Sequence, residues 1–123
     1  MKITSFGPEV MVTDAEPVIQ LFKDLGFEPR HHQEGLADKN VEGNVLRDAN
    51  GFRMNILQVP GLSRPAIPSI RMNVDNFDEA YELLKKHGFT EAPGASVTDT
   101  GSAKSIMMVS PTRYIINIVQ HIK

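Results

Sequence analysis

The sequence predicts an α+β fold in which two tandem βαβββ modules form a curved mixed sheet around a cleft. Three observations lead to this fold class: segments recur at one constant spacing, each half shows the same order of strand and helix patterns, and turn residues stand at matching points. A chain of 123 residues is long enough to bury a hydrophobic core and suits one compact domain.

The repeat is clearest where an apolar stripe ends in Gly-Phe. Residues 21–27 (LFKDLGF) resemble residues 83–89 (LLKKHGF), 62 positions later. The same spacing places residues 55–58 (NILQ) over residues 117–120 (NIVQ). One spacing that holds from the start of each half to its end indicates a duplication. We therefore expect a single domain over residues 1–123, with a first module at 1–60, a linker at 61–68 and a second module at 69–123.

A strand and then a helix are predicted at the start of each half. Val10 and Val12 alternate with other residues in the first half, which is typical of a half-buried strand, and residues 70–74 do so in the second. Asp14 is expected to cap the first helix. Asn76 is expected to cap the second, where Glu79 completes a capping-box pattern.

Each predicted helix has an apolar stripe and ends at a glycine. Gly26 and Gly88 stand where a helix often ends in a left-handed residue. We expect the two stripes to face the core. They consist of Val18, Leu21, Phe22 and Leu25 in the first helix and of Phe77, Ala80, Tyr81 and Leu84 in the second.

Two further strands are expected to close each half as a hairpin. The first hairpin turns at Asn50-Gly51 and the second at Pro111-Thr112-Arg113. The stretches 34–42 and 93–102 occupy matching places and are predicted to be mobile loops that flank the cleft. The four predicted hairpin strands lie at 44–48, 52–59, 105–109 and 114–121.

Composition and charge exclude several classes of function. The net charge of −2 gives no sign of a nucleic-acid footprint. The absence of cysteine excludes disulfides and thiolate metal sites. The N-terminus lacks the apolar run of a signal peptide, and no segment approaches the length that spans a bilayer. We expect a soluble cytoplasmic protein without nucleic-acid or membrane partners.

The tandem βαβββ arrangement resembles the vicinal oxygen chelate superfamily, which includes glyoxalase I, bleomycin-resistance proteins and extradiol dioxygenases. The resemblance covers nearly the whole chain. It rests on Val12-Thr13-Asp14 before a helix that ends in Leu25-Gly26-Phe27, on residues 73–80 (NVDNFDEA) and on residues 48–55 (DANGFRMN). Because the superfamily hosts isomerases, dioxygenases, epimerases and binding proteins, the resemblance implies a fold and leaves the activity open.

Resemblance to the metal enzymes of the superfamily implies four ligands, drawn from the first and last strands of each half. The matching positions in this sequence are Gly7, Asn55, Ser69 and Asn117. Glycine has no side chain, and neutral serine and asparagine oxygens hold catalytic divalent cations poorly without carboxylate or imidazole ligands. We therefore predict that the chain has neither a metal site nor another cofactor.

The alternation of side chains along the strands predicts which residues face the cleft. If Ile56 and Ile118 face the helices, their neighbours face the other way. Glu9 and Arg71 are repeat equivalents, and they could form a structural ion pair; alternatively Arg71 or Arg53 could clamp an anionic ligand. The predicted cleft-facing residues are Glu9, Met11, Arg53, Asn55, Leu57, Arg71, Asn73, Ile115 and Asn117.

Histidine and methionine give weaker indications. His31 and His32 are adjacent, so on a strand they point to opposite faces and cannot chelate one metal together. We expect them to be exposed, although one could act as a general base. Met54 and Met72 stand at strand positions that are expected to face the helices. This favours a role in the core over a role in the lining of an apolar pocket.

The bleomycin-resistance branch of the superfamily suggests the predicted function. Its members sequester a ligand and pair as homodimers, so we expect this chain to be a homodimer that binds a small, partly apolar molecule, neutral or anionic, in its cleft. No catalytic residue can be named. The alternative is a metal-dependent glyoxalase-, lyase- or dioxygenase-like enzyme with non-standard ligands.

Metal analysis separates these two functions. We expect the purified protein to carry no stoichiometric transition metal, because its four ligand positions lack imidazole and carboxylate groups. Thermal-shift titration with Ni²⁺, Zn²⁺ and Mn²⁺ should then leave the melting temperature nearly unchanged. Tight stoichiometric metal with a large rise in melting temperature would support the enzyme.

Overall fold

The structure is a computed structural model that describes residues 1–36, 41–62 and 64–122. The chain forms two compact units. The N-terminal unit comprises Gly7–Pro68, and the C-terminal unit comprises Met1–Phe6 together with Ser69–Lys123. The first residues after the two boundaries, Gly7 and Ser69, are themselves 62 positions apart. The structural division therefore follows the sequence repeat.

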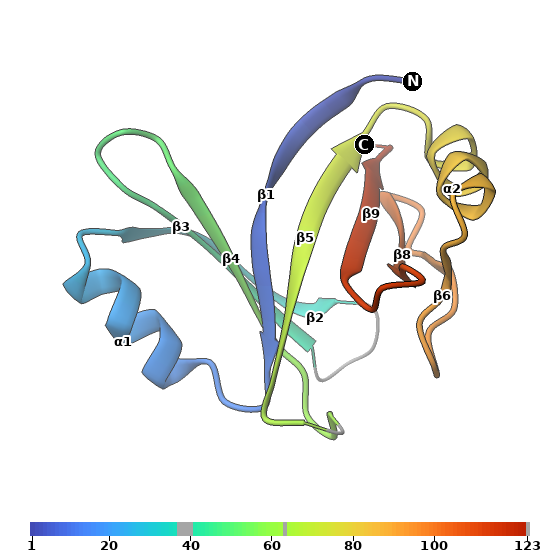
Figure 1. Cartoon of the computed structure of the whole chain (residues 1–123). Coiled ribbons are helices and arrows are strands. Elements are labelled where there is room, and N and C mark those ends of the chain that lie inside the picture. The colour runs from blue at the N-terminus through green and yellow to red at the C-terminus, as the bar shows by residue number, and fades with distance from the viewer. Residues whose placement is uncertain (37–40, 63, 123) are drawn as a thin grey trace. The chain divides into compact units, whose positions relative to one another are not determined.

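The N-terminal unit is a mixed sheet with one helix, blue to green in Figure 1. Its strand order is β2-β3-β4-β1, in which β1 and β4 are parallel and the other neighbours are antiparallel. The first residues of β1, up to Phe6, belong to the other unit. The elements are β1 (Ile3–Val12), α1 (Glu16–Asp24), β2 (Glu28–Leu36), β3 (Val41–Arg47) and β4 (Arg53–Gln58).

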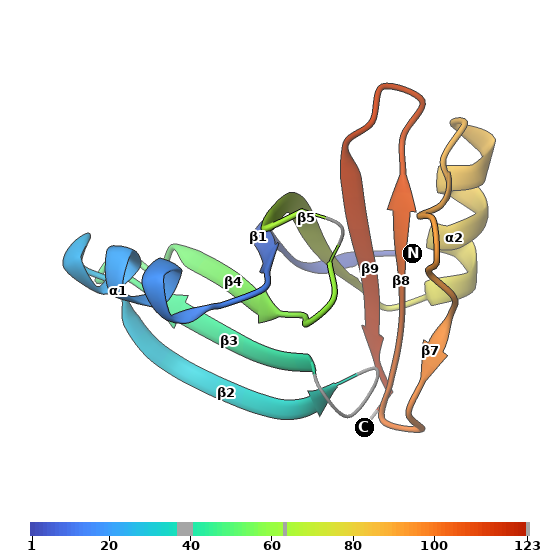
Figure 2. The same ribbon diagram turned by 90° about the horizontal axis from the view of Figure 1, so that it is seen from below.

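The C-terminal unit repeats this topology with a shorter outer edge. Its strand order is β5-β9-β8-β6, with β7 also paired to β8, and α2 lies alongside β8 and β9 (Figure 2). The first residues of β5, up to Pro68, belong to the N-terminal unit. The elements are β5 (Ala66–Val74), α2 (Phe77–Lys86), β6 (Thr90–Glu91), β7 (Thr98–Asp99), β8 (Ala103–Val109) and β9 (Ile115–His121).

The same spacing relates the strand registers of the two units. In the parallel pair β1–β4, Glu9 lies opposite Asn55, and in β5–β9 their equivalents Arg71 and Asn117 lie opposite each other. The pairs Val10–Ile56 and Met72–Ile118 are related in the same way. The α+β class, the mixed sheet and the repeated βαβββ order are therefore confirmed, with the two-residue strand β7 as an addition in the C-terminal unit.

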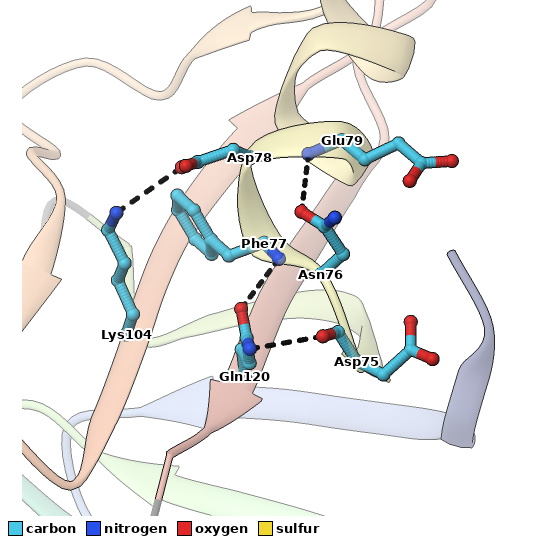
Figure 3. Close-up of polar contacts among 7 residues, drawn as sticks. All are labelled: Asp75, Asn76, Phe77, Asp78, Glu79, Lys104 and Gln120. Atoms are coloured by element: carbon cyan, nitrogen blue, oxygen red, sulfur yellow. Dashed lines mark hydrogen bonds and ion pairs between the residues drawn. The ribbon is translucent and has the colours of Figure 1, made fainter.

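A glutamine at the end of each last strand holds the start of the helix. Oε1 of Gln58 accepts the backbone N–H of Ala15 (2.9 Å), and Oε1 of Gln120 accepts that of Phe77 (2.7 Å). Gln120 also donates from Nε2 to the carbonyl oxygen of Asp75 (3.1 Å; Figure 3). Each amide thus satisfies a backbone group that the helix itself leaves without a partner.

The predicted N-cap of the second helix is confirmed, and the predicted N-cap of the first helix is wrong by one residue. Asn76 is the N-cap of α2 and its Oδ1 accepts the N–H of Glu79 (3.1 Å; Figure 3). The capping box is only half formed, because Glu79 pairs with the amino group of Met1 (2.6 Å). In α1 the N-cap is Ala15, and Asp14 instead accepts the N–H of Glu16 (3.2 Å).

A side chain at the first position of each terminal hairpin turn holds that turn. Oδ1 of Asp48 accepts the N–H of Phe52 (2.8 Å), and Oγ of Ser110 accepts that of Tyr114 (3.0 Å). In both turns the first residue's N–H also donates to the carbonyl oxygen of the last, at 3.1 and 2.9 Å. The penultimate residues Gly51 and Arg113 both have left-handed backbones, with φ of 86° and 79°.

Each unit has its own core between its helix and one face of its sheet. In the N-terminal unit, Val18, Ile19 and Phe22 of α1 pack against buried residues that include Leu46 and Ile56. None of the residues of α1, all of which the structure describes, is fully buried. In the C-terminal unit α2 buries Phe77 and Ala80. The second helix is therefore anchored more deeply than the first.

The apolar stripe predicted for α1 is partly wrong. Leu21 and Leu25 are 54% and 61% exposed, and Ile19 packs against the core in their place. The side chains that contact the sheet lie around Phe22, which also meets Phe27 edge-on at 5.2 Å between ring centroids. Among the described residues, neither helix is long and apolar enough to cross a lipid bilayer.

Several predicted loops contain strand. β2 extends to Leu36 and β3 begins at Val41, so most of the predicted loop 34–42 is strand on either side of residues 37–40, which lie outside the described residues. The predicted loop 93–102 contains β7, and the last residues of the predicted linker, 66–68, begin β5. These strands lie beside partners that the local sequence does not reveal, and backbone pairing extends them.

The glutamine contacts predict a measurable loss of stability. Gln58→Leu and Gln120→Leu should each lower the free energy of unfolding by about 1–3 kcal/mol, because a backbone N–H loses its acceptor. Urea unfolding measures the change. Gln20→Leu is the matched control, since Gln20 is exposed and bonds only within α1, to Glu16; a loss in Gln20→Leu as large as in the other two variants would contradict this role.

Candidate functional site

The sheet of the N-terminal unit brings five of the predicted cleft-facing residues onto one face. Glu9 lies opposite Asn55, and Met11 lies opposite Leu57, in the parallel pair β1–β4. Their neighbours in the strands, among them Ile56, pack on the α1 side, so these residues face away from the helix. Arg53, two residues before Asn55 on β4, shares this parity.

The sheet of the C-terminal unit brings the other four together in the same way. Arg71 lies opposite Asn117, and Asn73 lies opposite Val119, in the pair β5–β9. Ile118 packs on the α2 side, so these residues and Ile115 face away from that helix. The structure thus confirms the predicted parity in each unit separately. Whether the nine residues bind a ligand stays a prediction.

Polar side chains on these faces are buried. Glu9 is 2% exposed, and Asn55, Asn73 and Asn117 are 3%, 8% and 6% exposed. Nδ2 of Asn55 donates to the carbonyl oxygen of Pro8 (3.1 Å), which ties β4 to β1. Within the part of the chain that the structure describes, no buried side-chain nitrogen or oxygen lacks a hydrogen-bond partner. Asn55 therefore has a structural role, whatever else it does.

Arg71 is held by a neighbour on its own strand. Its Nε donates to Oδ1 of Asn73 at 3.2 Å. Because Arg71 and Asn73 are two residues apart on β5, their side chains lie on the same face of the sheet. This hydrogen bond fixes the direction of the guanidinium, a planar group whose geometry matches that of carboxylates and phosphates.

The pKa of His121 is perturbed by the same face. It is lowered from its ordinary value of 6.5, first by partial desolvation of the imidazole and then by the positive charge of Arg71. His121 lies opposite Ala103 on β8 and shares the parity of Asn117 on β9. The face thus favours the neutral imidazole and carries the guanidinium of Arg71.

The four positions implied for metal ligands do not form a metal site. Nδ2 of Asn55 is engaged with Pro8, and a Cβ added to Gly7 would meet Arg53 O at 3.8 Å, an ordinary contact. A larger residue at position 7 is therefore not excluded by a steric clash at Cβ. Among the described residues, no three His, Asp or Glu side chains cluster in a way that could hold a metal ion. The residues present do not fit the implied metal.

The adjacent histidines lie as predicted. His31 pairs with Val45 and His32 with Asn44, on opposite faces of β2, and both are exposed. Nδ1 of His32 lies 2.7 Å from Oδ1 of Asn44. Because the amide of Asn44 donates to Ile56 O (3.3 Å), its oxygen is the acceptor and Nδ1 of His32 carries the proton. Met54 and Met72 lie in the helix-side cores, as expected.

Two features were not found from the sequence. The glutamine contacts could have been found, since Gln58 and Gln120 stand 62 positions apart and each is the residue before the end of a predicted strand. The influence of Arg71 on the pKa of His121 could not have been found from the sequence. These two residues are distant in the sequence, and the pairing of β5 with β9 brings them together.

Comparison with known proteins identifies the fold. No protein-family model and no curated protein sequence matches the chain. Glyoxalase I from Zea mays matches 97% of it with a TM-score of 0.68 and 12% identity. Methylmalonyl-CoA epimerase from Mycobacterium tuberculosis matches 98% (TM-score 0.64, 14% identity). A glyoxalase/bleomycin resistance protein/dioxygenase superfamily member from Vibrio splendidus matches 97% (TM-score 0.60, 17% identity).

The chain therefore has the fold of the vicinal oxygen chelate superfamily, as the sequence resemblance implied. It spans 43% of the length of the maize protein, but 90% and 99% of the mycobacterial and Vibrio proteins. At identities of 12–17% the likeness establishes the fold and carries no activity with it.

The lowered pKa of His121 predicts how stability depends on pH. Well above pH 6.5 the imidazole is neutral in both folded and unfolded chains. As the pH falls below this value the unfolded chain takes up the proton first, so the free energy of unfolding should decrease down to the folded pKa. Denaturant unfolding at a series of pH values measures this slope.

Two variants sharpen the measurement. His121→Asn should flatten the slope below pH 6.5, because it removes the group that titrates. Arg71→Met should reduce the slope without removing it, because partial desolvation, the larger cause of the shift, remains. An unchanged slope in His121→Asn would show that other groups cause the pH dependence.

Proposed function

We propose that the chain binds and sequesters a small, partly apolar anion, without a metal, on the sheet face that points away from α2, and that Arg71 is its anchor. The observation that carries this proposal is the hydrogen bond from Nε of Arg71 to Asn73, which orients the guanidinium on that face. The homodimeric state and the cytoplasmic location expected from the sequence stay predictions.

The residues around Arg71 supply the apolar part of such a site. Val119 is two residues after Asn117 on β9, so its side chain is on the same face of the sheet. Met107 lies opposite Asn117 on β8. Aliphatic and thioether side chains beside a single cation suit a ligand that has a hydrocarbon body and one acidic group. The amide of Asn117 adds a polar group on the same face, as small-molecule sites require for orientation.

A metal-dependent enzyme has less support. The positions implied for its ligands hold neutral or absent side chains, and Asn55 is committed to Pro8. The fold itself decides nothing here, because the Zea mays structure is named as glyoxalase I and the Mycobacterium tuberculosis structure as an epimerase.

Fluorescent probes test the proposed anchor. Anilinonaphthalene sulfonate is a small apolar anion, and N-phenylnaphthylamine is a closely related molecule without the charge. Arg71→Met should weaken binding of the anion by about tenfold to a hundredfold, as expected for the loss of a charged hydrogen bond, and leave the neutral probe nearly unaffected.

Arg30→Met is the matched control, because Arg30 is an exposed arginine of the other unit that pairs with Glu28 at 3.4 Å. Circular dichroism of each variant establishes that it is folded. Equal weakening of both probes by Arg71→Met, or none, would contradict the anchoring role of Arg71.

A further inference from the structure

The turn between β3 and β4 combines an unusual sequence with open geometry. Asn50 is followed by Gly51, whereas every other asparagine of the sequence is followed by valine, isoleucine or phenylalanine. Asn50 and Gly51 are both exposed. A Cβ built on Gly51 would meet no atom within 4 Å. Both residues of this peptide bond are therefore exposed to solvent, and no side chain packs over Gly51.

We propose that Asn50 is a site of spontaneous covalent modification, in which its side-chain amide is lost and the turn acquires aspartate or isoaspartate. The backbone nitrogen of Gly51 gives its proton to a solvent base and attacks Cγ of Asn50. A C–N bond forms, the bond from Cγ to Nδ2 breaks, and ammonia leaves with a proton from water. The product is a five-membered succinimide.

Water then opens the succinimide in one of two ways. Addition at Cγ breaks the new bond and gives aspartate with the normal backbone. Addition at the backbone carbonyl carbon breaks the original peptide bond and gives isoaspartate, whose backbone runs through Cβ. Water is the only co-reactant, and no oxidant or reductant takes part. A glycine at position 51 favours the attack, because the absence of a side chain leaves its nitrogen accessible and its backbone flexible.

The contacts of Asp48 both slow this reaction and are lost through it. The N–H of Gly51 donates to the carbonyl oxygen of Asp48 (3.1 Å), and Oδ1 of Asp48 accepts the N–H groups of Asn50 (3.0 Å) and Phe52 (2.8 Å). The attack therefore requires the turn to open. A carboxylate at position 50 then lies close to that of Asp48, and isoaspartate lengthens the segment that Asp48 bridges.

The second unit provides an internal comparison. Its equivalent turn is held by Ser110 in the same way, but Thr112 and Arg113 stand where the first has Asn50 and Gly51. The left-handed conformation is the same in both turns. The reactive sequence is thus not required by the turn geometry, and only the first unit is open to this modification.

The experiment follows the native chain as it ages at mildly alkaline pH. Trypsin cuts after Arg47 and Arg53 and releases residues 48–53, and a short digestion at mildly acidic pH limits reaction during the digest. Tandem mass spectrometry should show this peptide gaining aspartate and isoaspartate with time. The peptide that contains Asn44 should stay unchanged, because Val45 follows it.

Two variants test the mechanism. Asn50→Gln should abolish the rapid change, because glutamine would have to close a larger ring. Asp48→Ala should accelerate it several-fold, because the turn opens more often; hydrogen exchange of the Gly51 amide reports this opening directly. An intact Asn50 in the aged protein, or modification of Asn44 at the same rate, would overturn the proposal. An Asp48→Ala chain that exchanges faster at Gly51 but is modified no faster would overturn the role given to Asp48.

Discussion

The structure depends on how the first and last strands of each unit pair. β1 with β4, and β5 with β9, are parallel neighbours, so the helix that leaves the first strand starts beside the end of the last. Gln58 and Gln120 stand at those ends and accept the N–H groups of Ala15 and Phe77. One amide in each unit thus joins the sheet to its helix. The register of the same parallel pairs places polar side chains together on the face that points away from each helix.

Much of the fold could be predicted, because the repeat tests each assignment twice. The alternation around Val12 and Val74 specified the first strands, and the spacing of 62 carried each element from one half to the other. The predicted burial of Leu21 and Leu25 was wrong, because α1 packs on its sheet through the side of the helix around Phe22. Helical periodicity finds an apolar stripe but does not say how much of it the sheet covers.

The candidate site was predictable only in part. Alternation along strands placed Arg71, Asn73 and Asn117 on the face away from the helix, which the register supports. The sequence could not show that Asn73 orients Arg71 or that Arg71 influences His121, since these depend on side-chain conformation and burial. Nor could it show that Asn55 is bonded to Pro8, a contact between segments 47 residues apart.

The division of β1 between the units has a consequence for how the chain folds. Met1–Phe6 belongs to the unit formed by Ser69–Lys123, and Lys2 exchanges hydrogen bonds with Asp75: its N–H donates to Oδ1 (2.6 Å) and its carbonyl accepts the N–H of Asp75 (3.0 Å). The C-terminal unit is therefore assembled from two segments that are separated in the sequence by the whole of the N-terminal unit, Gly7–Pro68. Joining them closes a long loop, which costs conformational entropy before any contact is gained. Contacts of such high sequence separation slow folding, so we expect Met1–Phe6 to join its unit late.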